Sequence, residues 1–249
     1  MSPITFLILV AGLVLLVIGA EFLVKGSSRL AAMLRIPPLI IGLTVVAYGT
    51  SAPEMSVSVM SALSAEGADI AIGNVVGSNI CNVLLILGLS ALIAPLGVTK
   101  QMIRSDVPIM IGVSFLLLLF SLDGQLSKVD SIILFIGGVT YTLSLIYQSS
   151  KQSVEHDEFT EEYSLSEPVT LIAWVKNGVY IIGGLVLLVL GSRWLVASAI
   201  TIAEYFQVSK LIVGLTIVAV GTSLPELFTS VIASYRGETE IAVGNVLGS

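Results

Sequence analysis

Charged residues are scarce in this sequence. Lys, Arg, Asp and Glu make up 11% of its 249 residues, whereas an ordinary soluble domain carries about a quarter. Apolar residues make up 55%, and the mean hydropathy is +1.02. Because a water-facing surface cannot be assembled from this composition, the sequence excludes a soluble globular domain and predicts a protein embedded in lipid.

Cysteine and histidine are almost absent. Cys81 is the only cysteine and lies in an apolar stretch, which excludes a disulfide and a thiolate metal site. His156 is the only histidine, and its polar segment offers no second nitrogen or sulfur ligand. The acidic residues around it lack the D-x-[DN]-x-[DN]-G spacing of a calcium loop, so we interpret the segment as a solvated connector. The acidic residues of this segment supply much of the net charge of −6. We predict neither a cofactor nor a nucleic-acid partner.

Long apolar runs recur along the chain. About 20 residues are needed for one helix to cross the bilayer core, and seven runs are of about that length: residues 4–20 (continuing amphipathically toward Met33), 39–63, 70–94, 107–122, 132–147, 179–202 and 211–233. An eighth opens at Ile241. The runs are continuous, whereas strands of a membrane β-barrel would alternate apolar and polar residues. The sequence therefore predicts an all-α membrane protein with about seven and a half helices.

Basic residues are distributed unevenly over the breaks between the runs. If the N-terminus lies outside, the inner breaks hold eight: Lys25, Arg29, Arg35, Lys100, Arg104, Lys151, Lys176 and Arg236. The outer breaks then hold only Lys128 and Lys210, with Arg193 within a span. Because inner loops of membrane proteins are enriched in Lys and Arg, we predict a multi-pass protein of the cell membrane with its N-terminus outside.

The chain contains an internal repeat. Residues 39–54 read LIIGLTVVAYGTSAPE and residues 211–226 read LIVGLTIVAVGTSLPE, with twelve of sixteen positions identical. Further along, residues 70–78 read IAIGNVVGS and residues 241–249 read IAVGNVLGS, with seven of nine identical. A duplication of this kind does not arise by chance and indicates two copies of one structural unit.

Five predicted helices separate each element from its copy, so the second copy enters the membrane from the opposite side. Inverted repeats are the architecture of secondary transporters, whose substrate site lies near the membrane midplane between the halves. We therefore predict an inverted-repeat fold of five plus five helices. Residues 1–147 would form the first repeat, 148–170 an acidic cytoplasmic connector, and 171–249 an incomplete second repeat.

The duplicated G-T-S-x-P-E motifs place polar groups inside apolar spans. Proline has no N–H, so the carbonyl four residues earlier, on Gly49 or Gly221, loses its helical partner and becomes a candidate oxygen ligand. Hydroxyls one turn before each glutamate share its helix face. Two such glutamates at matched depth favour a functional site over protonated structural groups. The first copy contributes Thr50, Ser51 and Glu54, and the second contributes Thr222, Ser223 and Glu226.

A second pair of motifs adds amide and hydroxyl oxygens. Asn74, Ser78 and Asn82 recur every four residues in the first copy, and Asn245 and Ser249 stand in the second. These asparagines and serines could instead form hydrogen bonds between helices. An all-oxygen ligand set suits calcium or sodium and disfavours zinc or copper. Two ionised glutamates would neutralise one Ca²⁺ or two Na⁺, so the two cations could compete for one site.

The doubled G-T-S-x-P-E and G-N-V-x-G-S motifs resemble the α-repeats of sodium/calcium exchangers in the calcium/cation antiporter superfamily. The resemblance covers essentially the whole chain and implies a ten-helix antiporter in which sodium entry drives calcium extrusion by alternating access, with the first and sixth helices sliding over a rigid core. We also expect the protein to function as a monomer. Proton-coupled relatives usually carry an acidic residue in the G-N-x-x motif, where this chain has Val76 and Gly77; this favours sodium.

The resemblance also implies a ligand set. The matching side chains are Thr50, Ser51, Glu54, Ser78 and Asn82 in the first repeat and Thr222, Ser223, Glu226 and Ser249 in the second, with backbone oxygens near Ala47 and Ala219. The counterpart of Asn82 would lie beyond Ser249, so we expect this chain to be a C-terminally truncated exchanger. Glu21 and Arg193 occupy matching repeat positions with opposite charges, and we interpret both as structural or gating residues.

Three alternatives remain at the level of the sequence. The same fold could couple calcium to protons, or could require potassium. A passive cation channel could use the same oxygen ligands. An intramembrane hydrolase is disfavoured, because the spans contain no aspartate pair, histidine-rich metal motif or Ser-Lys dyad, and the predicted protein is not an enzyme.

Overall fold

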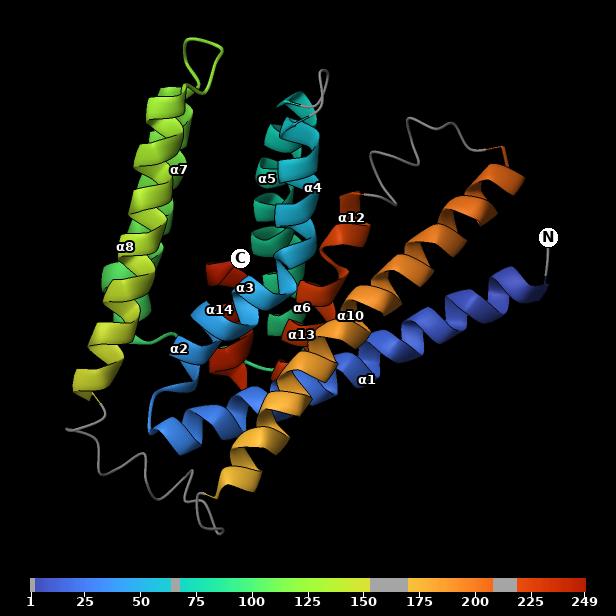
Figure 1. The fold of residues 1–249 in the computed structure, drawn as a ribbon, viewed down its shortest axis with the longest axis horizontal. Helices are drawn as coiled ribbons and strands as arrows, with labels where there is room; N and C mark the ends of the chain where they lie inside the picture. Colours follow the sequence, from blue (N-terminus) through green and yellow to red (C-terminus); the bar gives the residue numbers. More distant parts are fainter. Residues whose placement is uncertain (1–2, 64–67, 153–169, 208–218) are drawn as a thin grey trace.

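The computed structural model describes residues 3–63, 68–152, 170–207 and 219–249, and those residues form helices joined by short loops. The α-helices are α1 (Pro3–Leu34), α2 (Pro38–Ile41), α3 (Ala47–Thr50), α4 (Ala52–Ala62), α5 (Ala68–Ile80), α6 (Leu87–Ile93), α7 (Val107–Phe120), α8 (Lys128–Gln152), α10 (Leu171–Tyr205), α12 (Ala219–Thr222), α13 (Leu224–Tyr235) and α14 (Thr239–Gly248). Wider π-helical turns, η1 (Gly42–Val46), η2 (Cys81–Ile86) and η3 (Met102–Asp106), continue some of them (Figure 1).

Among the described residues, five helical stretches are long and apolar enough to cross a membrane: Pro3–Leu34, Ala71–Ile93, Met102–Phe120, Lys128–Tyr147 and Leu171–Ala203. The predicted all-α, multi-pass architecture is therefore confirmed. Helix α1 continues to Leu34, in agreement with the predicted amphipathic continuation toward Met33, and α10 begins at Leu171, before the run predicted over residues 179–202. Much of the predicted connector, including His156, lies outside the described residues, as does the first part of the run predicted over residues 211–233.

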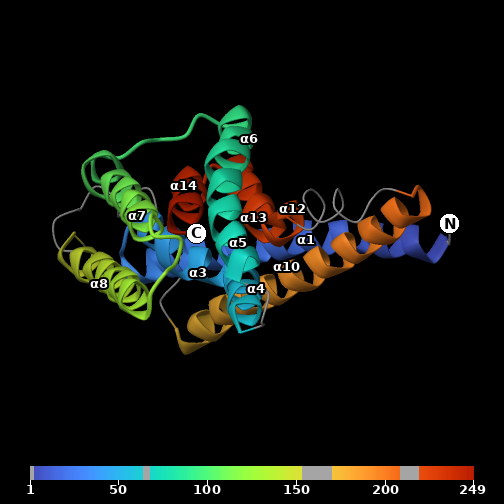
Figure 2. The same cartoon turned by 90° about the horizontal axis from the view of Figure 1, so that it is seen from above.

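Helices α1 and α10 lie side by side and cross the molecule together (Figures 1 and 2). Their contact is lined with glycine. A Cβ atom built on Gly19 would lie 2.9 Å from the Gly184 carbonyl oxygen, and one built on Gly191 would lie 2.7 Å from that of Gly12. Because the two backbones touch at these positions, even a methyl group is too large there, and α1 and α10 form one closely packed unit.

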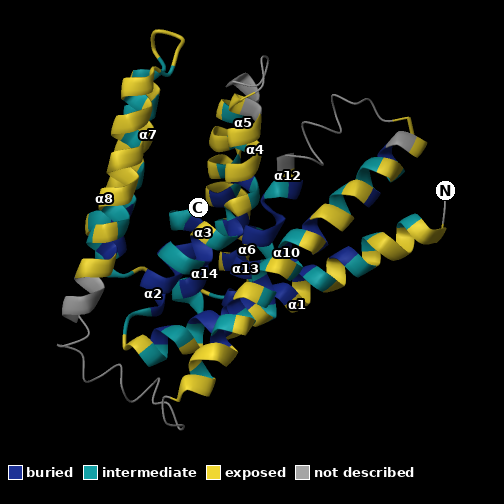
Figure 3. Cartoon of the chain, in the orientation of Figure 1, coloured by how far each residue is buried: buried dark blue, intermediate teal, exposed yellow. Residues whose placement is uncertain are grey.

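The core of the molecule lies between this unit and the α7–α8 pair, where the motif helices α2, α3, α13 and α14 gather (Figure 3). Here too backbones approach closely, since a Cβ on Gly244 would lie 2.7 Å from the Leu39 carbonyl oxygen. Large buried side chains such as Leu16, Leu188 and Ile241 fill the space between α1, α10 and α14. This packing fixes the relative positions of the two repeated motifs.

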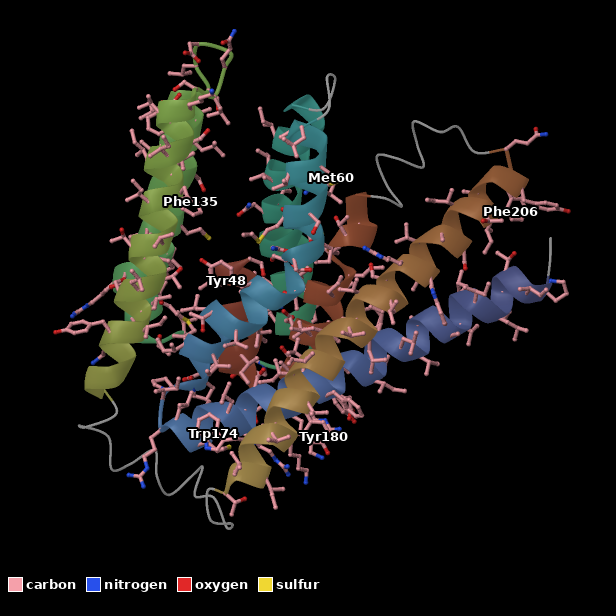
Figure 4. All side chains as sticks on the ribbon, viewed as in Figure 1. Tyr48, Met60, Phe135, Trp174, Tyr180 and Phe206 are labelled. Carbon is pink, nitrogen blue, oxygen red and sulfur yellow. The ribbon has the colours of Figure 1, made fainter. Side chains whose placement is uncertain are left out.

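Helices α7 and α8 stand to one side of the core and expose most of their residues (Figures 1 and 3). Apolar side chains project outward from them, as from the rest of the surface; Phe135 on α8 is 73% exposed (Figure 4). An apolar outer face of this kind is what lipid requires. Polar contacts join the pair internally and to the core: Tyr141 donates to the Asp106 carboxylate at 3.1 Å, and the Tyr48 and Thr142 hydroxyls are 2.7 Å apart.

The turn between α13 and α14 is joined to α1 by polar contacts. Arg236 forms an ion pair with Glu21 at 2.6 Å, and the Ser28 hydroxyl donates to Glu238 at 2.6 Å. The hydrogen bond and the charge of Glu21 raise the pKa of Arg236, so the guanidinium stays charged. Glu21, interpreted from the sequence as a structural or gating residue, thus has Arg236 as its partner. Within residues 3–63, 68–152, 170–207 and 219–249, Arg193 forms no ion pair.

Candidate cation site

In both repeated motifs the helix is interrupted at the serine that stands two residues before the proline. In the first repeat α3 ends at Thr50, Ser51 adopts φ −80° and ψ 3°, and α4 begins at Ala52. In the second repeat α12 ends at Thr222, Ser223 adopts φ −87° and ψ 9°, and α13 begins at Leu224. The matching backbone angles show that the two motifs fold alike, as their shared sequence predicts. Each break follows from the missing N–H of the proline two residues later.

The two motifs meet and exchange hydrogen bonds. The Ser51 hydroxyl donates to the Glu226 carboxylate at 2.8 Å, and the Ser223 hydroxyl donates to the Glu54 carboxylate at 3.3 Å. The two glutamates are close enough to repel each other when both are ionised. Hydroxyls on each motif were expected to converge with the glutamate of their own repeat. The break at the serine interrupts the helical spacing on which that expectation rested, and the serine hydroxyls reach across to the other repeat.

Thr50 and Thr222 lie at the same junction. The Thr50 hydroxyl is 3.0 Å from the Asn245 amide oxygen, and it also interacts with the Glu226 carboxylate. Thr222 interacts with the Glu54 carboxylate. Hydroxyls from each repeat therefore surround the carboxylate of the other.

Two asparagines brace the glutamate-bearing helices in the same way. Asn74 on α5 donates to the Glu54 carbonyl oxygen at 3.1 Å and to the Ser58 hydroxyl at 2.9 Å. Asn245 on α14 donates to the Glu226 carbonyl oxygen at 3.2 Å and to the Ser230 hydroxyl at 2.9 Å. Interhelical hydrogen bonding, one of the two alternatives for Asn74, is thus confirmed. Ser58 and Ser230 were not singled out from the sequence, although they recur at the repeat offset.

Three side-chain oxygens on the two motifs and on η2, which packs against α13 and α14, are buried and accept no hydrogen bond from the part of the chain that the structure describes. They are Oε2 of Glu54, Oε2 of Glu226 and Oδ1 of Asn82, whose residues are 7%, 1% and 3% exposed. A buried acceptor without a partner costs about 1–3 kcal/mol, and more if it is charged. These oxygens are therefore suited to accept a desolvated cation.

The remaining predicted residues have local contacts. The Ser78 and Ser249 hydroxyls donate to carbonyl oxygens of their own helices, at 3.1 and 2.7 Å. The Ala47 carbonyl oxygen accepts from the Thr50 hydroxyl at 3.3 Å, and Ala219 is the first residue of α12. Of the two carbonyls that proline was expected to free, that of Gly221 accepts a hydrogen bond from the Ser192 hydroxyl at 2.7 Å. Sequence reasoning missed Ser192, because its repeat position holds Ala20 in the first copy.

Known proteins are similar to this chain in sequence and in fold. The sequence matches the family described as sodium/calcium exchanger protein over residues 4–149 and 176–249. It is 42% identical to the putative antiporter CaxA of Alkalimonas amylolytica, covering 96% of this chain and 74% of that protein. It is 34% identical to the sodium/calcium exchanger MaX1 of Methanosarcina acetivorans, covering 100% and 80%. The fold resembles the solved sodium/calcium exchanger of Methanococcus jannaschii, with a TM-score of 0.83 at 33% identity and coverage of 100% and 78%.

Proposed function

The chain belongs to the sodium/calcium exchanger family, and we propose that its antiport of Ca²⁺ against Na⁺ takes place at the junction of the two repeated motifs. The observation that carries this proposal is the reciprocal hydrogen bonding of Ser51 with Glu226 and of Ser223 with Glu54. Each carboxylate keeps one buried oxygen free of hydrogen bonds to the described residues. Two carboxylates at one point supply the charge that one Ca²⁺ or two Na⁺ would neutralise.

The ligand set that we propose is the one expected from the sequence. It comprises the side chains of Thr50, Ser51, Glu54, Ser78, Asn82, Thr222, Ser223, Glu226 and Ser249, and the backbone at Ala47 and Ala219. Glu54, Glu226 and Asn82 are supported by their buried oxygens, which have no hydrogen-bond partner among the described residues. Ser78 and Ser249 would have to turn from their own helices toward the ion. Calcium tolerates such a mixed and adjustable set of oxygen ligands, whereas magnesium requires a near-ideal octahedron.

The two repeated motifs also indicate how the chain is divided into repeats. We propose that residues 1–147 form one repeat, that 148–170 connect the repeats on the cytoplasmic side, and that 171–249 belong to the second. The matched breaks at Ser51 and Ser223 support this assignment. Because both motifs of the site come from one chain, a single copy would suffice for binding, and we propose a monomer.

Exchange of three Na⁺ for each Ca²⁺ would move net charge, and we expect the membrane potential to drive it. One elementary charge crossing the membrane contributes about 2.3 kcal/mol per 100 mV, and about 1.4 kcal/mol corresponds to a tenfold change in a concentration ratio. In vesicles with a fixed sodium gradient and a potential set by potassium and valinomycin, 100 mV should shift the equilibrium calcium gradient by more than tenfold.

A calcium distribution that ignores the imposed potential would contradict three-for-one exchange and indicate two Na⁺ per Ca²⁺. The same vesicles also test the coupling ion. A proton gradient imposed without sodium should drive no calcium movement, and proton-driven uptake would instead support calcium/proton exchange. Calcium release without any opposing ion would indicate a passive channel.

We propose that the N-terminus lies outside the cell membrane, on the basis of the eight inner and two outer basic residues. Val98 and Asp123 are exposed in the loops before η3 and after α7, so they stand at opposite ends of one membrane-spanning helix. In a Cys81→Ala background that retains exchange, a cysteine at Val98 should react with an impermeant thiol reagent only from inside. A cysteine at Asp123 should react only from outside, and the reverse pattern would mean that the orientation is inverted.

A further inference from the structure

One buried hydrogen bond in the core joins helix α10 to the second motif. The Ser192 hydroxyl on α10 donates to the Gly221 carbonyl oxygen at 2.7 Å, and Ser192 is 7% exposed. Pro225, four residues after Gly221, has no N–H, so this carbonyl lacks its ordinary helical partner. The Ser192 hydroxyl takes the place of that N–H.

The bond lies directly before the helix break. The Gly221 carbonyl belongs to the peptide group that precedes Thr222, and Ser223 forms the break itself. Thr222 and Ser223 both interact with the Glu54 carboxylate, Ser223 by a hydrogen bond of 3.3 Å. Holding this peptide plane therefore orients the two hydroxyls that follow it.

The two repeats differ at this point. Ser192 follows Gly191 as Ala20 follows Gly19 in the matching segment of the first repeat, and alanine has no hydroxyl to donate. Helix α10 nevertheless touches the glycine of both motifs, because Leu185 lies against Gly49 and Val196 lies against Gly221. At Gly49 the contact comes from an apolar side chain, whereas at Gly221 an apolar contact and a hydrogen bond act together.

We propose that Ser192 is a positioning residue for the cation site, which by its hydrogen bond to Gly221 holds Thr222 and Ser223 in the geometry that binds calcium. The inference rests on the proposed location of that site. Ser192 does not touch the ion; it acts through the backbone before the break. A preorganised set of ligands binds more tightly than one that must be ordered on binding, so the loss of this bond should weaken calcium binding more than it slows exchange at saturating calcium.

The test measures sodium-driven calcium uptake by vesicles containing the full chain, over a range of calcium concentrations. Ser192→Ala should raise the half-saturating calcium concentration about tenfold and leave the maximal rate within about twofold. Tenfold corresponds to about 1.4 kcal/mol, which is within the contribution of one buried hydrogen bond. Ser192→Thr, which keeps the hydroxyl, should restore most of the affinity, and Ser192→Cys, a weaker donor, should lie between Thr and Ala.

The matched control is Thr201→Ala on the same helix, where the lost hydroxyl donates to its own helix at Ala197. It should leave the half-saturating concentration unchanged. Unchanged affinity in Ser192→Ala would overturn the proposal, as would equal losses in the Ala and Thr variants, which would indicate packing alone. If Ser192→Ala fails to fold, the Thr and Cys variants decide. Normal sodium-driven uptake by the unaltered chain separates failure of this inference from failure of the proposed function.

Discussion

Replacing Glu54 or Glu226 with glutamine should abolish sodium-driven calcium exchange. Each carboxylate carries one buried oxygen without a partner among the described residues, and glutamine replaces the negative charge with a neutral amide of similar shape. At an effective dielectric constant of about 20, two unit charges 4 Å apart interact by about 4 kcal/mol, which corresponds to roughly a thousandfold in affinity. Calcium, with two charges, should lose more than sodium. Calcium uptake by vesicles containing each variant measures the effect.

A suitable control is Asp106→Asn. Asp106 is a buried carboxylate, 3% exposed, which accepts a hydrogen bond from Tyr141 on α8 and belongs to neither motif. Asparagine can still accept that bond, so this variant should retain most of the exchange although it also loses a buried negative charge. Size-exclusion profiles of all three variants should match that of the unaltered chain. Near-normal calcium uptake by Glu54→Gln or Glu226→Gln would mean that the cation is bound elsewhere.

Much of this site could be predicted from the sequence, because the relevant signals are local and occur twice. The proline of each motif predicts a helix break, and both breaks are found, at Ser51 and Ser223. The duplication predicts that the two motifs meet, and the hydrogen bonds of those two serines to the opposite glutamates show that they do. Apolar run length predicts the helices themselves.

What the sequence could not predict depends on contacts between distant segments. Which glutamate a serine donates to is decided by the way the repeats face each other, and helical spacing within one motif does not contain that information. The hydrogen bond from Ser192 to the Gly221 carbonyl oxygen has no counterpart in the first repeat, where Ala20 takes the place of Ser192. The internal repeat therefore could not point to this bond. Asn74 carried a clear signal, but its pattern is the same for an ion ligand and for a bond between helices, and only the structure shows the bonds that its amide nitrogen donates to Glu54 and Ser58.

The sequence also does not show which glycines of α10 contact α1. Gly183 and Gly184 are adjacent in the sequence, yet they face different surroundings. A Cβ atom on Gly184 would lie 2.7 Å from both the Gly19 carbonyl oxygen and the Leu23 nitrogen of α1, whereas one on Gly183 would meet nothing within 4 Å. Nothing in the sequence distinguishes the two positions, because the difference is set by the direction in which α10 presents each residue to α1.

This pair gives a test of how closely the α1–α10 unit must pack. Alanine at either position should favour the isolated helix by about 1 kcal/mol relative to glycine. At Gly184 the added methyl group meets backbone atoms that no side-chain rotation can move aside, and overpacking of this kind costs about 1–3 kcal/mol or more. Gly184→Ala should therefore lower the melting temperature in detergent, and Gly184→Leu should prevent folding and so abolish exchange.

Gly183→Ala and Gly183→Leu serve as the matched controls on the same turn of the same helix. Both should fold and exchange calcium normally, and the alanine variant should melt at or slightly above the temperature of the unaltered chain. Thermal unfolding in detergent, followed by size-exclusion chromatography, ranks the four variants. Similar stability of Gly184→Leu and Gly183→Leu would mean that α1 and α10 can separate without loss of the fold. A large loss of stability at Gly184 alone would instead establish that direct backbone contact between α1 and α10 is required to assemble the two halves of the site. The reason is that α1 packs against α13, which carries Glu226, and α10 packs against both motif glycines.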